Sequence, residues 1–228
     1  MINIADNLRL VNNQIIAASS KTTSSTSKVS LLAVSKTKPI SLIQQAYAAG
    51  QRHFGENYVQ ETVEKVQQLA ELTDITWHFI GPLQANKTKL IANNVTWVHS
   101  VDREKIAKRL NQQRDINITP LNVCLQVNIS GEQSKSGVAV TEVAKLAEFI
   151  NNCENLCLRG LMAIPEKTKD KIAARDSFRQ MQTLFNQLSH QYPSVDTLSM
   201  GMSNDMDIAI ECGSTMIRVG TAIFGARS

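Results

Sequence analysis

A lysine stands at the end of a short apolar run near the start of the chain. Residues 31–34 (Leu-Leu-Ala-Val) have the character of a strand buried on both faces of a parallel sheet, and Ser35 and Lys36 follow where such a strand leaves the sheet. An amine held there, partly removed from water, has a lowered pKa and can form a Schiff base with a carbonyl compound. A lysine that only caps a strand and reaches water is the commoner case, so this interpretation depends on the rest of the chain.

Two segments near the other end of the chain carry residues suited to binding a phosphate group. Residues 199–205 offer a glycine for a tight turn, free backbone amides, and Ser203, which is expected to cap the next helix and donate to phosphate. Residues 218–222 follow on the next strand, where Gly220 permits close approach and Thr221 offers a hydroxyl. A Schiff-base lysine and a phosphate cradle on neighbouring strands are the two anchors needed for pyridoxal 5′-phosphate.

Strands and helices alternate along the whole chain, after an amphipathic N-terminal helix predicted over residues 2–18. Apolar segments predict eight strands, at residues 31–34, 52–56, 75–80, 96–101, 121–129, 156–164, 197–201 and 216–220, and a helical segment separates each pair. This order favours a (β/α)₈ TIM-type barrel formed by residues 1–228 as a single domain, with a doubly wound open sheet as the alternative. In a closed barrel the first and eighth strands are neighbours, and phosphate commonly binds after strands seven and eight.

Composition narrows the class of protein. Of 228 residues, 43% are hydrophobic and 19% charged, which is ordinary for a globular protein. A net charge of +4 favours anionic small molecules, but with 5% aromatic residues it gives little support to a nucleic-acid partner. Membrane spans and a signal-peptide layout are not expected, so we expect a cytoplasmic protein. The four cysteines lack metal-type spacing, so no metal site is predicted.

Five segments of the chain closely resemble the pyridoxal phosphate homeostasis proteins, in order and across essentially the whole length. They are long enough to be specific, and they comprise residues 32–39 (LAVSKTKP), 54–61 (FGENYVQE), 78–87 (HFIGPLQANK), 160–165 (GLMAIP) and the stretch from 198–203 (LSMGMS) to 213–225 (GSTMIRVGTAIFG). The resemblance implies a barrel like the N-terminal domain of alanine racemase, with pyridoxal phosphate held covalently on Lys36.

The same resemblance implies roles for further residues. Ser203, Gly220 and Thr221 match positions that contact the phosphate, and Arg218 matches one near the pyridine nitrogen. Asn57, His78 and Met200 match positions that line the pocket, without an assigned role.

Other candidates follow from their place in the chain. Lys135, in an exposed-type loop after the fifth strand, is a candidate for a transient second contact with the cofactor. His53 and His99 lie in strand-like segments and are interpreted as structural.

The resemblance further implies a carrier and regulator of the intracellular pyridoxal phosphate supply, with no established turnover, and PLP-requiring apoenzymes as possible recipients. Related racemases carry a β-rich domain that supplies a tyrosine base and dimer contacts, and we expect this chain to lack that domain and to be a monomer. An arginine beside the pyridine nitrogen would disfavour its protonation and weaken the cofactor as an electron sink. The alternatives are a PLP-dependent racemase or lyase and a cofactor-free Schiff-base aldolase.

Overall fold

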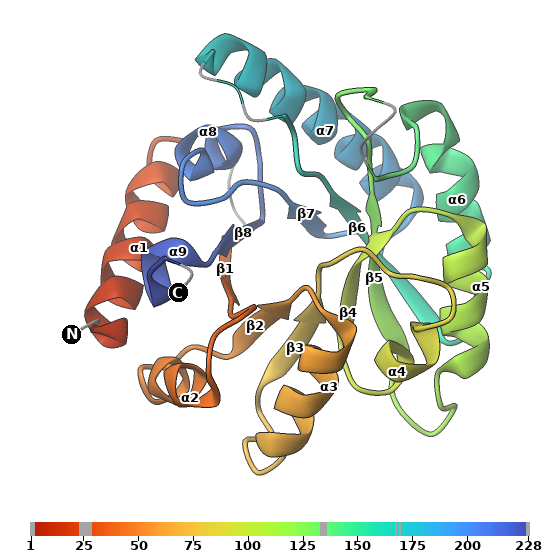
Figure 1. Cartoon of the computed structure of the whole chain (residues 1–228). Helices are drawn as coiled ribbons and strands as arrows, with labels where there is room; N and C mark the ends of the chain where they lie inside the picture. Colours follow the sequence, from red (N-terminus) through yellow and green to blue (C-terminus); the bar gives the residue numbers. More distant parts are fainter. Residues whose placement is uncertain (1–2, 23–28, 133–135, 167, 169, 227–228) are drawn as a thin grey trace.

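Eight parallel strands close into a barrel in the computed structural model of the chain (Figure 1). The structure describes residues 3–22, 29–132, 136–166, 168 and 170–226. Each strand pairs with the next in sequence, and the eighth pairs with the first, which excludes the open sheet and confirms the predicted barrel. The strands are β1 (Ser30–Val34), β2 (His53–Glu56), β3 (Thr76–Phe79), β4 (Trp97–Val101), β5 (Leu121–Gln126), β6 (Leu156–Met162), β7 (Thr197–Ser199) and β8 (Met216–Val219).

Helices follow the strands around the outside of the barrel. They are α1 (Ile4–Ser19), α2 (Ile40–Ala48), α3 (Val59–Gln68), α4 (Thr88–Ala92), α5 (Glu104–Gln113), α6 (Val143–Asn151), α7 (Lys171–Gln191), α8 (Met206–Glu211) and α9 (Thr221–Phe224), with a 3₁₀ turn at Val140–Glu142. Several strands end earlier than the apolar pattern predicts. The reason is that apolar residues continue into buried loop segments, such as Val127 after β5 and Met200 after β7.

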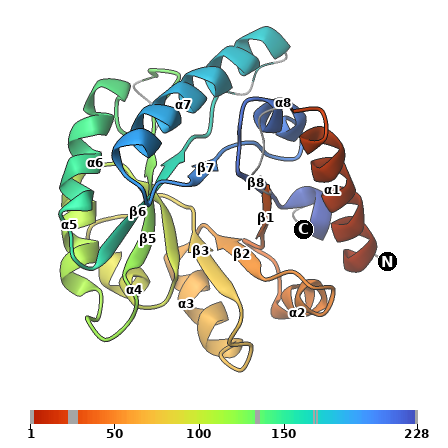
Figure 2. The same ribbon diagram turned by 180° about the vertical axis from the view of Figure 1, so that it is seen from behind.

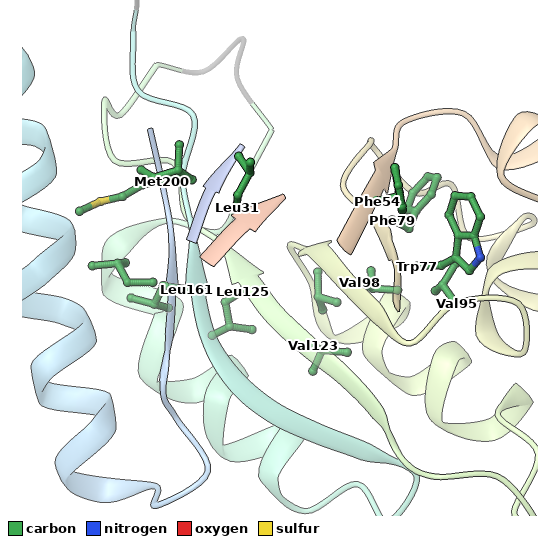
Figure 3. Close-up of a cluster of buried hydrophobic side chains, with 14 of the residues drawn as sticks. Leu31, Phe54, Trp77, Phe79, Val95, Val98, Val123, Leu125, Leu161 and Met200 are labelled. Atoms are coloured by element: carbon green, nitrogen blue, oxygen red, sulfur yellow. The ribbon is translucent and has the colours of Figure 1, made fainter. Parts of the chain in front are cut away.

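Alternate residues of the strands enter two different apolar environments, as a period-two structure requires. Leu31 and Ala33 belong to the large cluster that includes the buried faces of the helices, and Figure 3 shows Leu31 among other residues of that layer. Leu32 instead joins Ile80 and Met216 in a separate small cluster to which no helix residue contributes. The strand residues that point into the barrel are therefore separate from the large cluster between barrel and helices, here called the barrel–helix layer. Polar side chains that point inward can meet inside the barrel.

The N-terminal helix covers the side of the barrel where β8 meets β1. In both views α1 lies beside α8 and α9, and Asn7 Nδ2 donates to the Ile223 carbonyl at 2.8 Å (Figures 1 and 2). The buried stripe of α1, Ile4, Leu8, Val11 and Ile15, is the one that the sequence predicts. Since α9 contains only four residues, α1 supplies much of the cover at this place. In the described part of the chain, no helix has the length and apolar character needed to cross a membrane.

Candidate functional site

Lys36 occupies the place expected of it, in the turn directly after β1. Val34 ends the strand, Ser35 is fully buried, and Lys36 is half-buried at the carboxyl-terminal mouth of the barrel. The Ser35 amide donates to the Gly55 carbonyl at 3.0 Å, which continues the β1–β2 pairing by one residue. The lysine therefore follows a rigid, sheet-paired segment.

The end of β8 lies against the end of β1. Leu32 pairs with Arg218 in the register, and a Cβ placed on Gly220 would be only 3.0 Å from the Val34 carbonyl oxygen. Glycine suits the close packing of these two chain segments, because a side chain here would press against the Val34 carbonyl. Gly220 is also the residue before α9, and the exposed Thr221 begins that helix. Gly220 therefore lies beside the last residue of β1, two positions before Lys36.

The turn after β7 differs in one respect from the prediction. Gly201 has the expected positive φ of 92°, and a Cβ there would meet the Ala209 Cβ at 2.5 Å. Ser203 does not cap the following helix, however, because α8 begins at Met206 and Asp205 stands at its N-cap. Asp205 Oδ1 instead accepts the Met202 amide at 2.6 Å and closes the turn. Ser203 is half-buried in that turn.

Arg218 lies inside the barrel with 4% of its surface exposed. Its Nη1 donates to the carbonyl and hydroxyl oxygens of Ser199 at 2.6 and 2.9 Å, and its Nη2 donates to the Ala163 carbonyl at 2.8 Å. These acceptors lie at or directly after the ends of β7 and β6, so the guanidinium joins three neighbouring strands. Burial lowers the pKa of Arg218 to about 10, which leaves it charged at neutral pH.

His78 is the centre of a chain of hydrogen bonds across the barrel interior. Its Nε2 lies 3.0 Å from His53 Nδ1, and its Nδ1 lies 2.9 Å from His99 Nε2. His99 Nδ1 in turn lies 3.1 Å from the Ser199 hydroxyl, which Arg218 also contacts. Burial lowers the pKa of His78 well below its usual range and, with the Arg218 charge, lowers that of His99 to about 3. Both rings are therefore neutral at physiological pH.

The two remaining predicted residues among those the structure describes, Asn57 and Met200, follow β2 and β7. Asn57 directly follows β2, and its Oδ1 is buried with no hydrogen-bond partner among the described residues. An orphaned buried polar atom at the mouth of the barrel is suited to a ligand. Met200 is fully buried, and its side chain belongs to the barrel–helix layer shown in Figure 3. Lys135 lies outside the described residues.

Comparison with known proteins identifies the family. Residues 7–228 match the alanine racemase N-terminal domain family. The pyridoxal phosphate homeostasis protein of Vibrio cholerae is 54% identical over 230 residues, covering 100% of this chain and 98% of the relative. The structure of PipY from Synechococcus elongatus without PLP is 36% identical in sequence and has a TM-score of 0.86, with 97% of this chain and 100% of PipY covered. The structure of PipY with PLP bound has a TM-score of 0.82 at the same coverage. The chain belongs to the pyridoxal phosphate homeostasis protein family.

Two features of this member of the homeostasis protein family were not predicted from the sequence: a largely buried ionic cluster and the hydrogen bonds that join three histidines. Glu56, Glu61 and Lys65 meet beside the Lys36 turn, and Lys65 Nζ lies 2.8 Å from Glu56 and 2.7 Å from Glu61. The spacing of Glu61 and Lys65, four residues apart on one helix, was the available signal. His53 and His99 were interpreted separately as structural, whereas the structure joins them to His78.

Three features at the mouth of the barrel are suited to binding pyridoxal phosphate. Asn57 Oδ1 is a buried acceptor without a described partner, Gly220 lets the segment after β8 lie close to β1, and Arg218 supplies a buried positive charge. Each of these lies at or just below the carboxyl ends of β1, β2 and β8, where ligands of this fold bind.

Proposed function

We propose that this protein binds pyridoxal phosphate covalently through Lys36 and controls the free concentration of the cofactor, acting in the cytoplasm as a monomeric single barrel domain. The observation that carries the proposal is the contact between the ends of β1 and β8, which brings Gly220 against Val34, two residues before Lys36. Membership of the homeostasis family and the PLP-bound structure of PipY support it. Enzymes that require the cofactor are the proposed recipients.

Each residue of the site has a proposed part. Lys36 supplies the amine, while Ser203, Gly220 and Thr221 hold the phosphate through hydroxyl and backbone donors.

The remaining residues have proposed parts around the pyridine ring. Arg218 faces the pyridine nitrogen, and Asn57 offers its unpaired oxygen or, with the amide turned, its nitrogen. His78 supports Arg218 through His99 and Ser199. Met200 is proposed to line the pocket only through the shape of its loop.

Pyridoxal phosphate supplies an aldehyde that accepts an amine and, in enzymes, a sink for electrons. The chain's own residues limit the second use. Arg218 is charged, and its guanidinium donates to three acceptors in the protein. A charged guanidinium keeps its own protons, and its positive charge disfavours protonation of a neighbouring pyridine nitrogen. An unprotonated pyridine nitrogen is a weak electron sink, which favours a carrier over an enzyme.

A racemase or lyase is the second candidate, and one observation favours it. Tyr58 follows β2 at the mouth of the barrel and is 52% exposed, so its hydroxyl could act as a base. Tyr47 donates to Asp74, at 2.5 Å, and Tyr192 ends α7, so neither is placed for that role. The carrier proposal treats Tyr58 as a surface residue.

Absorbance with borohydride reduction tests the carrier proposal. Addition of pyridoxal phosphate to the wild-type protein should give a visible band that borohydride bleaches, and Lys36→Ala should lack it. Lys38→Ala is the matched control, because Lys38 lies two residues away and its Nζ donates to the Ala226 carbonyl at 2.6 Å. Absence of the band in the wild type would exclude the proposal and favour a cofactor-free aldolase.

A further inference from the structure

The backbone on both sides of Lys36 is held by one pair of side chains from α3. Lys65 Nζ donates to the carbonyl of Ser35, the residue before Lys36, at 2.7 Å. Glu61 Oε1 accepts the amide of Thr37, the residue after Lys36, at 2.6 Å. Lys65 and Glu61 are themselves joined at 2.7 Å through the same Glu61 oxygen. The two peptide groups that flank Lys36 are thus connected through a single ion pair.

A third residue anchors this pair to the sheet. Glu56, the last residue of β2, accepts Lys65 Nζ at 2.8 Å and the Ser35 hydroxyl at 2.6 Å through its Oε1. Lys65 has three donors, and all three have acceptors: the Ser35 carbonyl, Glu56 and Glu61. Glu56 and Ser35 are fully buried and Lys65 is 5% exposed, so water does not compete for the bonds of Lys65 to Glu56 and to the Ser35 carbonyl. The ammonium group is therefore fixed in place.

The turn itself adopts a conformation that needs support. Thr37 has φ of 61°, in the left-handed region that β-branched residues avoid. Such a conformation persists where surrounding contacts determine it. Here the Thr37 amide is the group that Glu61 holds, so the ionic cluster stabilises the least favourable residue of the turn.

We propose that Glu61 and Lys65 are positioning residues, which fix the turn so that the Lys36 amine points toward the aldehyde of pyridoxal phosphate. The proposal rests on the proposed function. Replacing a buried ion pair such as Lys65–Glu56 by well-packed apolar residues is often neutral or stabilising, so stability alone does not account for this cluster. In this cluster the bonds are directed at the two peptide groups beside one lysine, which is the geometry that positioning requires.

Positioning matters because attachment depends on orientation. The neutral Lys36 amine adds to the aldehyde carbon, its two hydrogens leave with the aldehyde oxygen as water, and a C=N bond replaces the C=O bond. With the phosphate held by the proposed residues that follow β7 and β8, the amine must approach from a fixed direction. A displacement of about 1 Å can cost about 100-fold in rate. Loosening the turn should slow attachment without changing the chemistry of the amine.

Glu61 provides the sharpest test, because its side chain is 23% exposed and borders an open surface groove of about 420 Å³. Glu61→Ala removes the acceptor of the Thr37 amide without leaving a closed internal space. Glu61→Gln keeps an acceptor oxygen at the same place. Glu64→Ala is the matched control, since Glu64 carries the same charge on the exposed face of the same helix.

Two measurements are made on each variant. Hydrogen–deuterium exchange of the ligand-free protein reports order in peptides covering residues 35–38, and absorbance reports the rate of adduct formation with pyridoxal phosphate. We expect Glu61→Ala to exchange faster in the turn and to react about 10- to 100-fold more slowly than Glu64→Ala, at a similar melting temperature. Glu61→Gln should recover most of the rate.

A second variant tests Lys65. It combines Lys65→Met with Glu56→Gln, so that no unpaired charge remains buried. This double variant should also form the adduct slowly and exchange its amide hydrogens quickly in residues 35–38. Equal rates and equal exchange in Glu61→Ala and Glu64→Ala would overturn the positioning role while leaving the proposed function intact. If the wild type forms no adduct on Lys36, the proposed function fails, and this inference fails with it.

Discussion

Arg218 donates from a single nitrogen, Nη1, to both the carbonyl and the hydroxyl oxygen of Ser199. A guanidinium only donates, so the Ser199 hydroxyl oxygen is an acceptor in this bond and its own hydrogen is available to another group. His99 Nδ1, at 3.1 Å, is the partner that the structure gives it. A Ser199 hydroxyl that donates to His99 Nδ1 gives every hydrogen bond in the histidine chain one direction.

The first prediction concerns the resulting tautomers. If Ser199 donates to Nδ1 of His99, then His99 carries its hydrogen on Nε2 and donates to His78 Nδ1, and His78 donates from Nε2 to His53. Nitrogen NMR of the ring resonances should therefore find His78 and His99 as neutral Nε2–H tautomers. An Nδ1–H tautomer at His99 would contradict this direction. In Ser199→Ala the bias should weaken, since the donor is gone.

The histidine chain also predicts how stability depends on pH. His99 has a pKa of about 3 in the folded protein, against an ordinary 6.5 when unfolded. Above pH 6.5 both states are neutral, so the full stability is present. Below pH 6.5 the unfolded state binds a proton that the folded state does not, and the free energy of unfolding falls by about 1.4 kcal/mol per pH unit for each such histidine. Burial of His78 adds a contribution of the same sign.

Denaturant unfolding between pH 7 and pH 5 measures this slope. His99→Gln should lower the slope by about one proton, even if it also lowers the stability at pH 7. His190→Gln, on the exposed face of α7, is the matched control and should keep the wild-type slope. An unchanged slope in His99→Gln would show that His99 is not held neutral in the barrel.

A third prediction concerns the phosphate. Ser203→Ala combined with Thr221→Val removes two hydroxyl donors, each worth ~1.5–3 kcal/mol against a charged partner. Affinity for pyridoxal phosphate should fall by about tenfold or more, measured by absorbance titration. Affinity for unphosphorylated pyridoxal should hardly change. Equal losses for the two ligands would place the phosphate-binding residues elsewhere.

The two parts of the site differ in how far sequence alone could predict them. The meeting of the β1 end, which leads into Lys36, with the β8 end, which leads into Gly220, was predictable because chain order and strand count determine which strand ends meet in a closed barrel. The histidine chain was not, because a shift of one residue in register would turn these rings outward, and the register is set by pairings such as Gly55 with His78. The contact of Glu61 with Thr37 joins residues 24 positions apart through the packing of α3, which no local pattern encodes.

The fourth prediction separates a carrier from an enzyme. Racemisation needs a base on each face of the cofactor, and each base is typically worth ~10²–10⁴-fold in rate. Lys36 could serve one face, and Tyr58 is the candidate for the other. We expect exchange of the amino-acid α-proton with deuterated solvent to stay near the rate of free pyridoxal phosphate, in the wild type and in Tyr58→Phe alike. Multiple-turnover racemisation of alanine or serine that Lys36→Ala abolishes would establish an enzyme.

The site of covalent attachment is the most direct test of the central claim. The protein is mixed with pyridoxal phosphate, reduced with borohydride and digested, and the modified peptide is identified by mass spectrometry. We predict one main adduct, on Lys36, and none on the same peptide of Lys36→Ala. The fold of this variant should be intact because the half-buried Lys36 side chain adds little to the core. A main adduct on Lys38 or Lys135 in the wild-type protein would contradict it.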